Sequence, residues 1–125
     1  MRKQYYFRRS ERGLLAWDVD RLVLRSKHLP RIPVPLTSIR ELDERFCSEH
    51  EDALTWRAVV EHVRLIQEAD VSFPIILSAD GRVMDGMHRV VKAVLLGRAT
   101  IEAVQFADDP EPDCVGRNPD ELPYD

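Results

Sequence analysis

The chain has 125 residues, the length of one domain, and 44% of them are hydrophobic, which is enough to line a core without disulfides. Its 18 Lys and Arg against 22 Asp and Glu give a net charge of −4, which argues against a protein that holds nucleic acid through its overall charge. A local basic patch is compatible with this average. Residues 1–12 carry five Lys or Arg and one Glu, whereas residues 106–125 carry seven Asp or Glu and one Arg.

Neither a signal peptide nor a membrane span is visible, because no segment has the necessary apolar run. Cys47 and Cys114 are 67 positions apart and follow no disulfide framework, so we expect a reduced, cytoplasmic protein without membrane partners. Cys47 and His50 have the spacing of metal ligands, but only Cys114 and the distant His28, His62 and His88 could complete a zinc site, so none is assigned.

Prolines and charge divide the chain into a single domain, residues 1–106, and an acidic, proline-rich tail, residues 107–125. Proline breaks helices, so we expect the tail to be extended. Leu122 and Tyr124 give it apolar groups to bury, which favours a tail that lies against the domain over one that is loose in solvent. Four of the eight prolines lie in this tail: Pro110, Pro112, Pro119 and Pro123.

The elements of the first half are a short helix, a strand and a second short helix. Asp18 is placed as the N-cap of a helix over residues 19–26. Residues 32–36 predict an edge strand, because their two prolines cannot donate to a central ladder. Thr37 or Ser38 is expected to cap a brief helix that runs through Leu42.

The first long helix is predicted over residues 55–69 with Thr55 as its cap, after a polar loop. His62 lies within its apolar arc, and two interpretations stay open: a core histidine bonded to a backbone carbonyl, or a histidine that lines a pocket. The arc predicts a helix packed on the core by one face, through Ala58, Val59, Val63, Leu65, Ile66 and Ala69.

After Pro74 the hydrophobic period changes to two. Residues 75–77 predict a buried strand, Asp80 and Gly81 a hairpin turn, and residues 82–85 the returning strand. Gly86 ends that strand, and a helix follows over residues 87–96, with Gly97 just past its end. A last strand is predicted over residues 100–106. The fold class is therefore α+β (mixed α/β), with a small mixed sheet flanked by helices.

The junction at Gly86 has the features of a phosphate site. A helix start presents free backbone N–H groups and the positive end of the helix dipole, and glycine lets an anion approach the backbone. His88, Arg89 and Lys92 fall on the helix arc opposite the buried one, so they add positive charge there.

Residues 74–106, PIILSADGRVMDGMHRVVKAVLLGRATIEAVQF, resemble the central part of the ParB/sulfiredoxin-like superfamily. The shared features are a strand, a glycine-containing hairpin, the motif G-x-[HR]-R-x-x-[KR]-A and a closing strand. The resemblance covers residues 33–106 and is closest over 74–106. It implies a short, stand-alone member with the family's fold, in which this junction binds nucleotide phosphates.

The resemblance implies a bound nucleotide, which is CTP in the partition proteins, ATP in sulfiredoxin and ADP in related kinases. Gly86 and the backbone at Met87 and His88 would cradle a phosphate, Arg89 would pair with it, and Lys92 would assist. Met87 stands where sulfiredoxin has its reactive cysteine, so sulfinic-acid reduction is not expected. The chain has no helix-turn-helix region after this domain, so sequence-specific DNA binding is not expected either.

Asp85 and His88 are the candidate catalytic residues. The Asp85 carboxylate can hold a Mg²⁺ that bridges phosphate oxygens or accept a proton from an attacking hydroxyl, or it can simply cap the helix. His88 can donate to a phosphate or shuttle a proton, or it can be an exposed histidine. Met84 and Met87 are expected to pack in the core.

The leading hypothesis is nucleotide-dependent phosphotransfer or hydrolysis, with a small molecule or a protein as acceptor. Two alternatives stay open. One is a non-enzymatic regulatory or interaction module related to chromosome-partitioning proteins, in which the nucleotide only stabilises a conformation. The other is a metal-dependent nuclease, which needs a cluster of carboxylates, and the sequence places only Asp85 at the junction.

Overall fold

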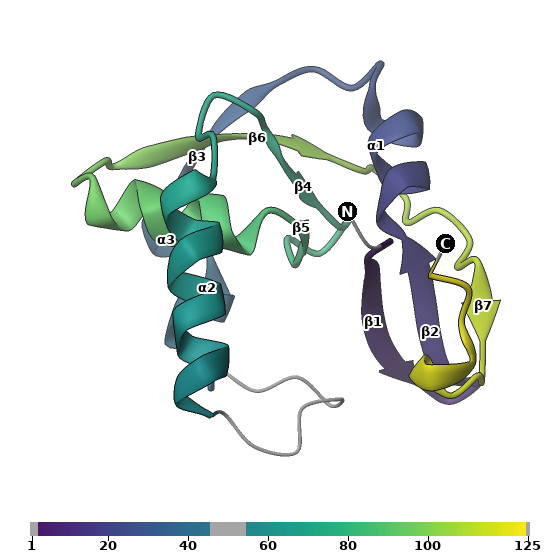
Figure 1. The fold of residues 1–125 in the computed structure, drawn as a ribbon. Helices are drawn as coiled ribbons and strands as arrows, with labels where there is room; N and C mark the ends of the chain where they lie inside the picture. Colours follow the sequence, from purple (N-terminus) through teal and green to yellow (C-terminus); the bar gives the residue numbers. More distant parts are fainter. Residues whose placement is uncertain (1–2, 46–54, 125) are drawn as a thin grey trace.

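The computed structural model describes residues 3–45 and 55–124, and it has helices and two sheets, which confirms the predicted α+β class (Figure 1). One sheet has the strand order β1-β2-β7 and the other β3-β6-β4-β5. The strands are β1 (Tyr5–Ser10), β2 (Gly13–Asp18), β3 (Ile32–Pro35), β4 (Ile75–Leu77), β5 (Val83–Asp85), β6 (Thr100–Gln105) and β7 (Cys114–Val115). The α-helices are α1 (Val19–Ser26), α2 (Trp56–Glu68) and α3 (Met87–Leu95). No helix in these residues is long and apolar enough to cross a membrane.

The larger sheet forms the core that carries the junction. Strand β4 pairs parallel to β6 and antiparallel to β5, and β3 lies at the edge, where its two prolines were expected. Helix α3 packs against β4 and β6. The main core cluster includes side chains with no exposed surface, namely Ile75, Val90, Ala93 and Ala103.

The smaller sheet begins with a hairpin that the sequence did not predict. Strand β1 pairs with β2 from Tyr5 opposite Asp18 to Ser10 opposite Gly13. Two consecutive arginines at the end of β1 obscure the apolar alternation that identifies a strand. The third strand, β7, comes from the acidic tail and pairs with β2.

The tail lies against the rest of the chain, as expected. Leu122 is buried, and the carbonyl of Pro110 accepts a hydrogen bond of 2.8 Å from Trp17 Nε1. The tail carboxylates pair with basic residues near the N-terminus: Asp109 with Arg8, and Asp113 with Arg21, each at 2.9 Å. The pair of Arg8 and Asp109 therefore joins the basic and acidic ends of the chain, and the pair of Arg21 and Asp113 holds the tail on α1.

Local signals placed several helix ends correctly. The Asp18 carboxylate accepts from the Asp20 amide at 2.9 Å, and the Thr55 hydroxyl accepts from the Ala58 amide at 3.1 Å.

The prediction of a helix capped by Thr37 or Ser38 is wrong. Two 3₁₀ turns stand there, Leu36–Ser38 and Arg40–Asp43, with no side-chain cap, and the Ser38 hydroxyl donates to the carbonyl of Pro35 instead.

Helix α2 differs from its prediction in packing. It has the expected length and cap, but none of its residues is buried, and Val63 is 45% exposed. The reason is its place in the fold. Helix α2 packs on α3, which itself covers the sheet, so α2 is a second layer (Figure 1).

Candidate functional site

The strand-to-helix junction is built around Gly86. Strand β5 ends at Asp85, and Gly86, with φ 109° and ψ 19°, is the N-cap of α3. A Cβ at this position would lie 2.6 Å from Ile75 Cγ2 and 2.8 Å from Arg89 Nη2. Glycine is therefore required both by the left-handed backbone and by the close approach of two side chains. Because Gly86 is the N-cap, the interpretation of Asp85 as the helix cap is wrong.

Asp85 and Arg89 form an ion pair across the first turn of α3. Arg89 Nη2 donates to Asp85 Oδ2 at 3.1 Å and to the carbonyl of Pro74 at 3.3 Å. Both side chains are about four-fifths buried, at 21% and 20% exposure. Arg89 Nε is buried and has no partner within the part of the chain that the structure describes. The guanidinium is thus held in place but keeps donor capacity.

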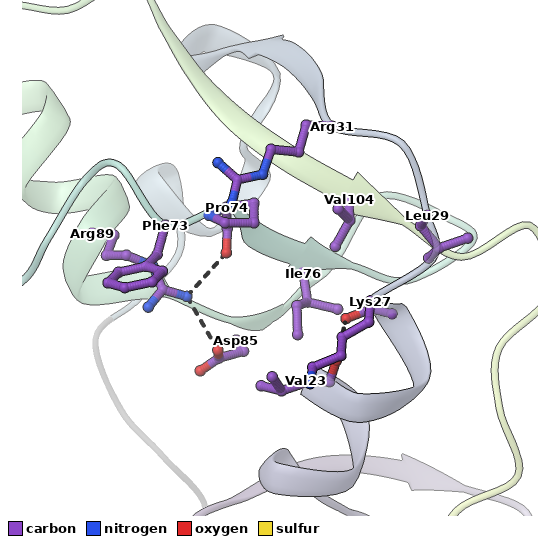
Figure 2. Close-up of a pocket in the computed structure, with 11 residues that line it drawn as sticks. Val23, Lys27, Leu29, Arg31, Phe73, Pro74, Ile76, Asp85, Arg89 and Val104 are labelled. Carbon is purple, nitrogen blue, oxygen red and sulfur yellow. Dashed lines mark hydrogen bonds and ion pairs between the residues drawn. The ribbon is translucent and has the colours of Figure 1, made fainter.

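A pocket of about 340 Å³ opens beside this ion pair, between α1 and the junction (Figure 2). Three cationic side chains and one carboxylate line it: Lys27, Arg31, Arg89 and Asp85. The rest of the lining is mainly apolar and comes from Val23, Leu29, Phe73, Pro74, Ile76 and Val104, with Ser26. The pocket therefore combines an apolar wall with a surplus of positive charge.

Two of the cationic lining residues were missed in the sequence. Lys27 directly follows α1, and Arg31 directly precedes β3, so both are more than fifty positions from the junction. Arg31 Nη1 donates to the carbonyl of Ser72 at 3.2 Å, which ties it to the segment just before β4. The basic residues between α1 and β3 were the available signal, but only the tertiary fold brings them to Arg89.

Lys92 lies away from the pocket and already has partners. Its ammonium donates to the carbonyls of Gln67 and Ala69, both at 2.7 Å. These carbonyls belong to the C-terminal end of α2, where a cation is favoured by the helix dipole. The structure therefore places Lys92 as a cap that fastens α2 to α3.

His88 contacts α2 as well. Its Nε2 lies 3.0 Å from Nδ1 of His62, and the ring centroids are 5.2 Å apart. Burial, then the nearby His62 and Arg89, lower the pKa of His88 below its usual value, and Asp85 opposes this. A neutral pair can share one hydrogen bond, with one ring donating and the other accepting. The lining of the pocket includes neither histidine.

Both methionines have packing roles, as expected. Met84 is 3% exposed in the core, and Met87 is half-buried and packs against the cluster that contains Ile75. Of the predicted site residues, Asp85 and Arg89 line the pocket, whereas Gly86, Met87 and His88, which were expected to cradle a phosphate, are not among its lining residues. The structure turns the side chains of His88 and Lys92 toward α2.

Neither family models, nor curated proteins, nor solved structures yield a match to this chain.

The residues Cys47 and His50 lie outside the described part of the chain. Within the described part, no three His, Cys, Asp or Glu side chains gather in a way that could hold a metal ion.

Proposed function

We propose that the pocket beside Asp85 and Arg89 binds a nucleotide, with a phosphate against Arg89 and the base against the apolar lining. One observation carries this proposal: a single pocket combines three cationic side chains with an apolar lining. Its volume of about 340 Å³ falls within the range of about 300–1,000 Å³ usual for small-molecule sites.

Arg89 is the main phosphate ligand in this proposal. Its Nη2 is engaged by Asp85 and Pro74, whereas its Nε is a buried donor without a partner in the described residues. A phosphate in the pocket would lie against this guanidinium and give it a second anionic partner besides Asp85. Lys27 adds positive charge from the α1 side of the pocket, and Arg31 adds it from beside Pro74, as Figure 2 shows. Lys27 and Arg31 take the assisting phosphate contact that the resemblance implied for Lys92, because Lys92 is bonded to carbonyls of α2.

The apolar wall suits a nucleobase. Phe73 is 58% exposed, although a large aromatic side chain gains by being covered, and it lines the pocket. Aromatic rings bind bases by stacking with little dependence on sequence. We therefore assign Phe73 to contact with the base.

Asp85 is the residue that fits a chemical step. Among the two candidate catalytic residues, it is the one that lines the pocket. Mg²⁺ commonly binds through one or two carboxylates and the phosphates of its substrate, so a single carboxylate beside a phosphate suits it. When bound, Mg²⁺ would neutralise charge on the phosphates. Asp85 also orients Arg89 through their ion pair, so its substitution affects binding as well as turnover.

A thermal-shift panel tests the proposal. Binding to the folded state alone raises the melting temperature by mass action. We expect ATP, ADP or CTP to raise it more than inorganic phosphate does, because only a nucleotide contacts the apolar wall. The panel includes GTP and is run with and without Mg²⁺. No shift with any nucleotide at millimolar concentration would refute the proposal.

A binding module without turnover is the second candidate, and the position of His88 favours it. Its side chain faces His62 on α2, which leaves Asp85 as the candidate proton acceptor at the pocket. Release of phosphate from labelled nucleotide distinguishes an enzyme from a module that only binds the nucleotide. Turnover above background that is lost in Asp85→Asn at nucleotide concentrations where the variant still binds supports an enzyme, and binding by the wild type without turnover supports the module.

A further inference from the structure

Helix α2 exposes an apolar stripe to solvent. Trp56, Val60 and Val63 are 86%, 66% and 45% exposed. Their spacing of four and three residues places them on one face of the helix. The half-buried side of α2 packs on α3, so this stripe lies on another side. An exposed tryptophan within an apolar stripe is typical of an interaction site.

A stripe of alternating charge runs along the neighbouring edge of the same helix. Its members also follow the spacing of four and three residues, and all are exposed: Arg57, Glu61, Arg64 and Glu68. Within one chain, Arg64 and Glu61 form an ion pair on the surface. The order along the helix is positive, negative, positive, negative.

We infer that this face binds a second copy of the chain, with the two α2 helices antiparallel about a two-fold axis. In such a pair the charged stripe of one helix lies beside the charged stripe of the other helix. The two stripes run in opposite directions. Arg57 faces Glu68 of the other copy and Glu61 faces Arg64, so all four contacts join opposite charges.

The apolar stripe fits the same arrangement. Val60 of one copy lies opposite Val63 of the other, and Trp56 covers the far end of the partner helix. A parallel pair would instead place the charged stripe beside the partner's opposite edge, the one closer to α3. The charge pattern therefore selects the antiparallel dimer.

The contact is small, so the dimer is expected to depend on concentration. A helix of 13 residues is about 20 Å long, and a helix pair of that length buries less than the roughly 800 Å² per partner of a standard interface. Trp56 supplies the largest share, since an aromatic side chain can bury about 150–250 Å². This inference does not depend on nucleotide binding.

Sedimentation velocity from micromolar to several hundred micromolar tests the dimer. We expect the wild type to pass from monomer to dimer, with a blue shift of Trp56 fluorescence, because the other tryptophan, Trp17, is already buried. Val60→Glu should weaken association at least tenfold. Leu24→Glu is the matched control, since Leu24 is 63% exposed on α1. A wild type that stays monomeric, or equal effects of the two variants, would overturn the inference.

Charge exchange tests the antiparallel geometry. Arg57→Glu and Glu68→Arg each place like charges opposite one another, and each should weaken the dimer several-fold. The two substitutions together restore opposite charges, and the dimer should recover. These residues are exposed, so the variants should keep the wild-type circular dichroism spectrum. Failure of the double variant to recover would overturn the antiparallel arrangement.

Discussion

Gly86→Ala tests whether the junction needs glycine for space as well as for backbone conformation. The backbone at Gly86 has φ 109°, where residues with a side chain are strained. The new Cβ would also lie 2.6 Å from Ile75 Cγ2, and Ile75 is fully buried, so it has little room to move. The second neighbour, Arg89 Nη2 at 2.8 Å, can move only by disturbing its bonds to Asp85 and Pro74.

The expected loss of stability has two parts. The left-handed conformation costs an alanine about 1–2 kcal/mol. Overpacking against a buried side chain adds about 1–3 kcal/mol. Gly81→Ala is the matched control: Gly81 has φ +87°, but a Cβ there meets nothing within 4 Å in the described residues, so only the first part applies. The difference between the two variants isolates the cost of space.

Thermal and urea unfolding of both variants measure this difference. An extra loss of about 2 kcal/mol lowers Tm by about 6–10 °C in a chain of this size. Gly86→Ala should therefore melt well below Gly81→Ala, and it should also lose nucleotide binding as Arg89 is displaced. Equal stabilities would refute the packing argument, and unchanged binding would show that Arg89 is not held by this contact.

Two further predictions concern the attachment of α2 to α3. The pKa of His88 is lowered in the folded state, so the unfolded chain binds this proton more readily, and stability present above about pH 6.5 is lost as the pH falls. Lowering the pH from 7.5 to 5 should reduce Tm more in the wild type than in His88→Gln, and equal slopes would contradict this assignment. Lys92→Met removes the cap on the carbonyls of Gln67 and Ala69. It should cost about 1–3 kcal/mol and raise amide hydrogen exchange in α2, and unchanged exchange there would show that the cap does not hold the helix.

Features with local causes could be predicted from the sequence. Asp18 and Thr55 act as helix caps through amides two and three residues away, so their role depends on neighbouring residues alone. The turn at Gly81 and the helix start at Gly86 follow from glycine's conformational freedom. The ion pair of Asp85 and Arg89 also has a local cause, their spacing of one helical turn, but the sequence analysis assigned Arg89 to a phosphate and did not predict this pair.

Features that depend on distant segments could not be predicted. Strand β7 pairs Val115 with Leu15, a hundred residues away, and its two residues carry no strand pattern of their own. Lys92 looks like a free cation on a helix projection, and only the packing of α2 gives it carbonyl partners. The cationic lining of the pocket likewise depends on how α1 approaches the junction.

The most direct test of nucleotide binding is calorimetric titration of wild type, Arg89→Gln and Arg98→Gln with the nucleotide that gives the largest thermal shift. Arg98 is exposed and does not belong to the pocket lining, so it controls for the loss of one positive charge. We expect Arg89→Gln to weaken binding at least tenfold, because a charged hydrogen bond contributes about 1.5–3 kcal/mol, and Arg98→Gln to bind like the wild type. Equal affinity in Arg89→Gln and wild type would contradict the proposed site.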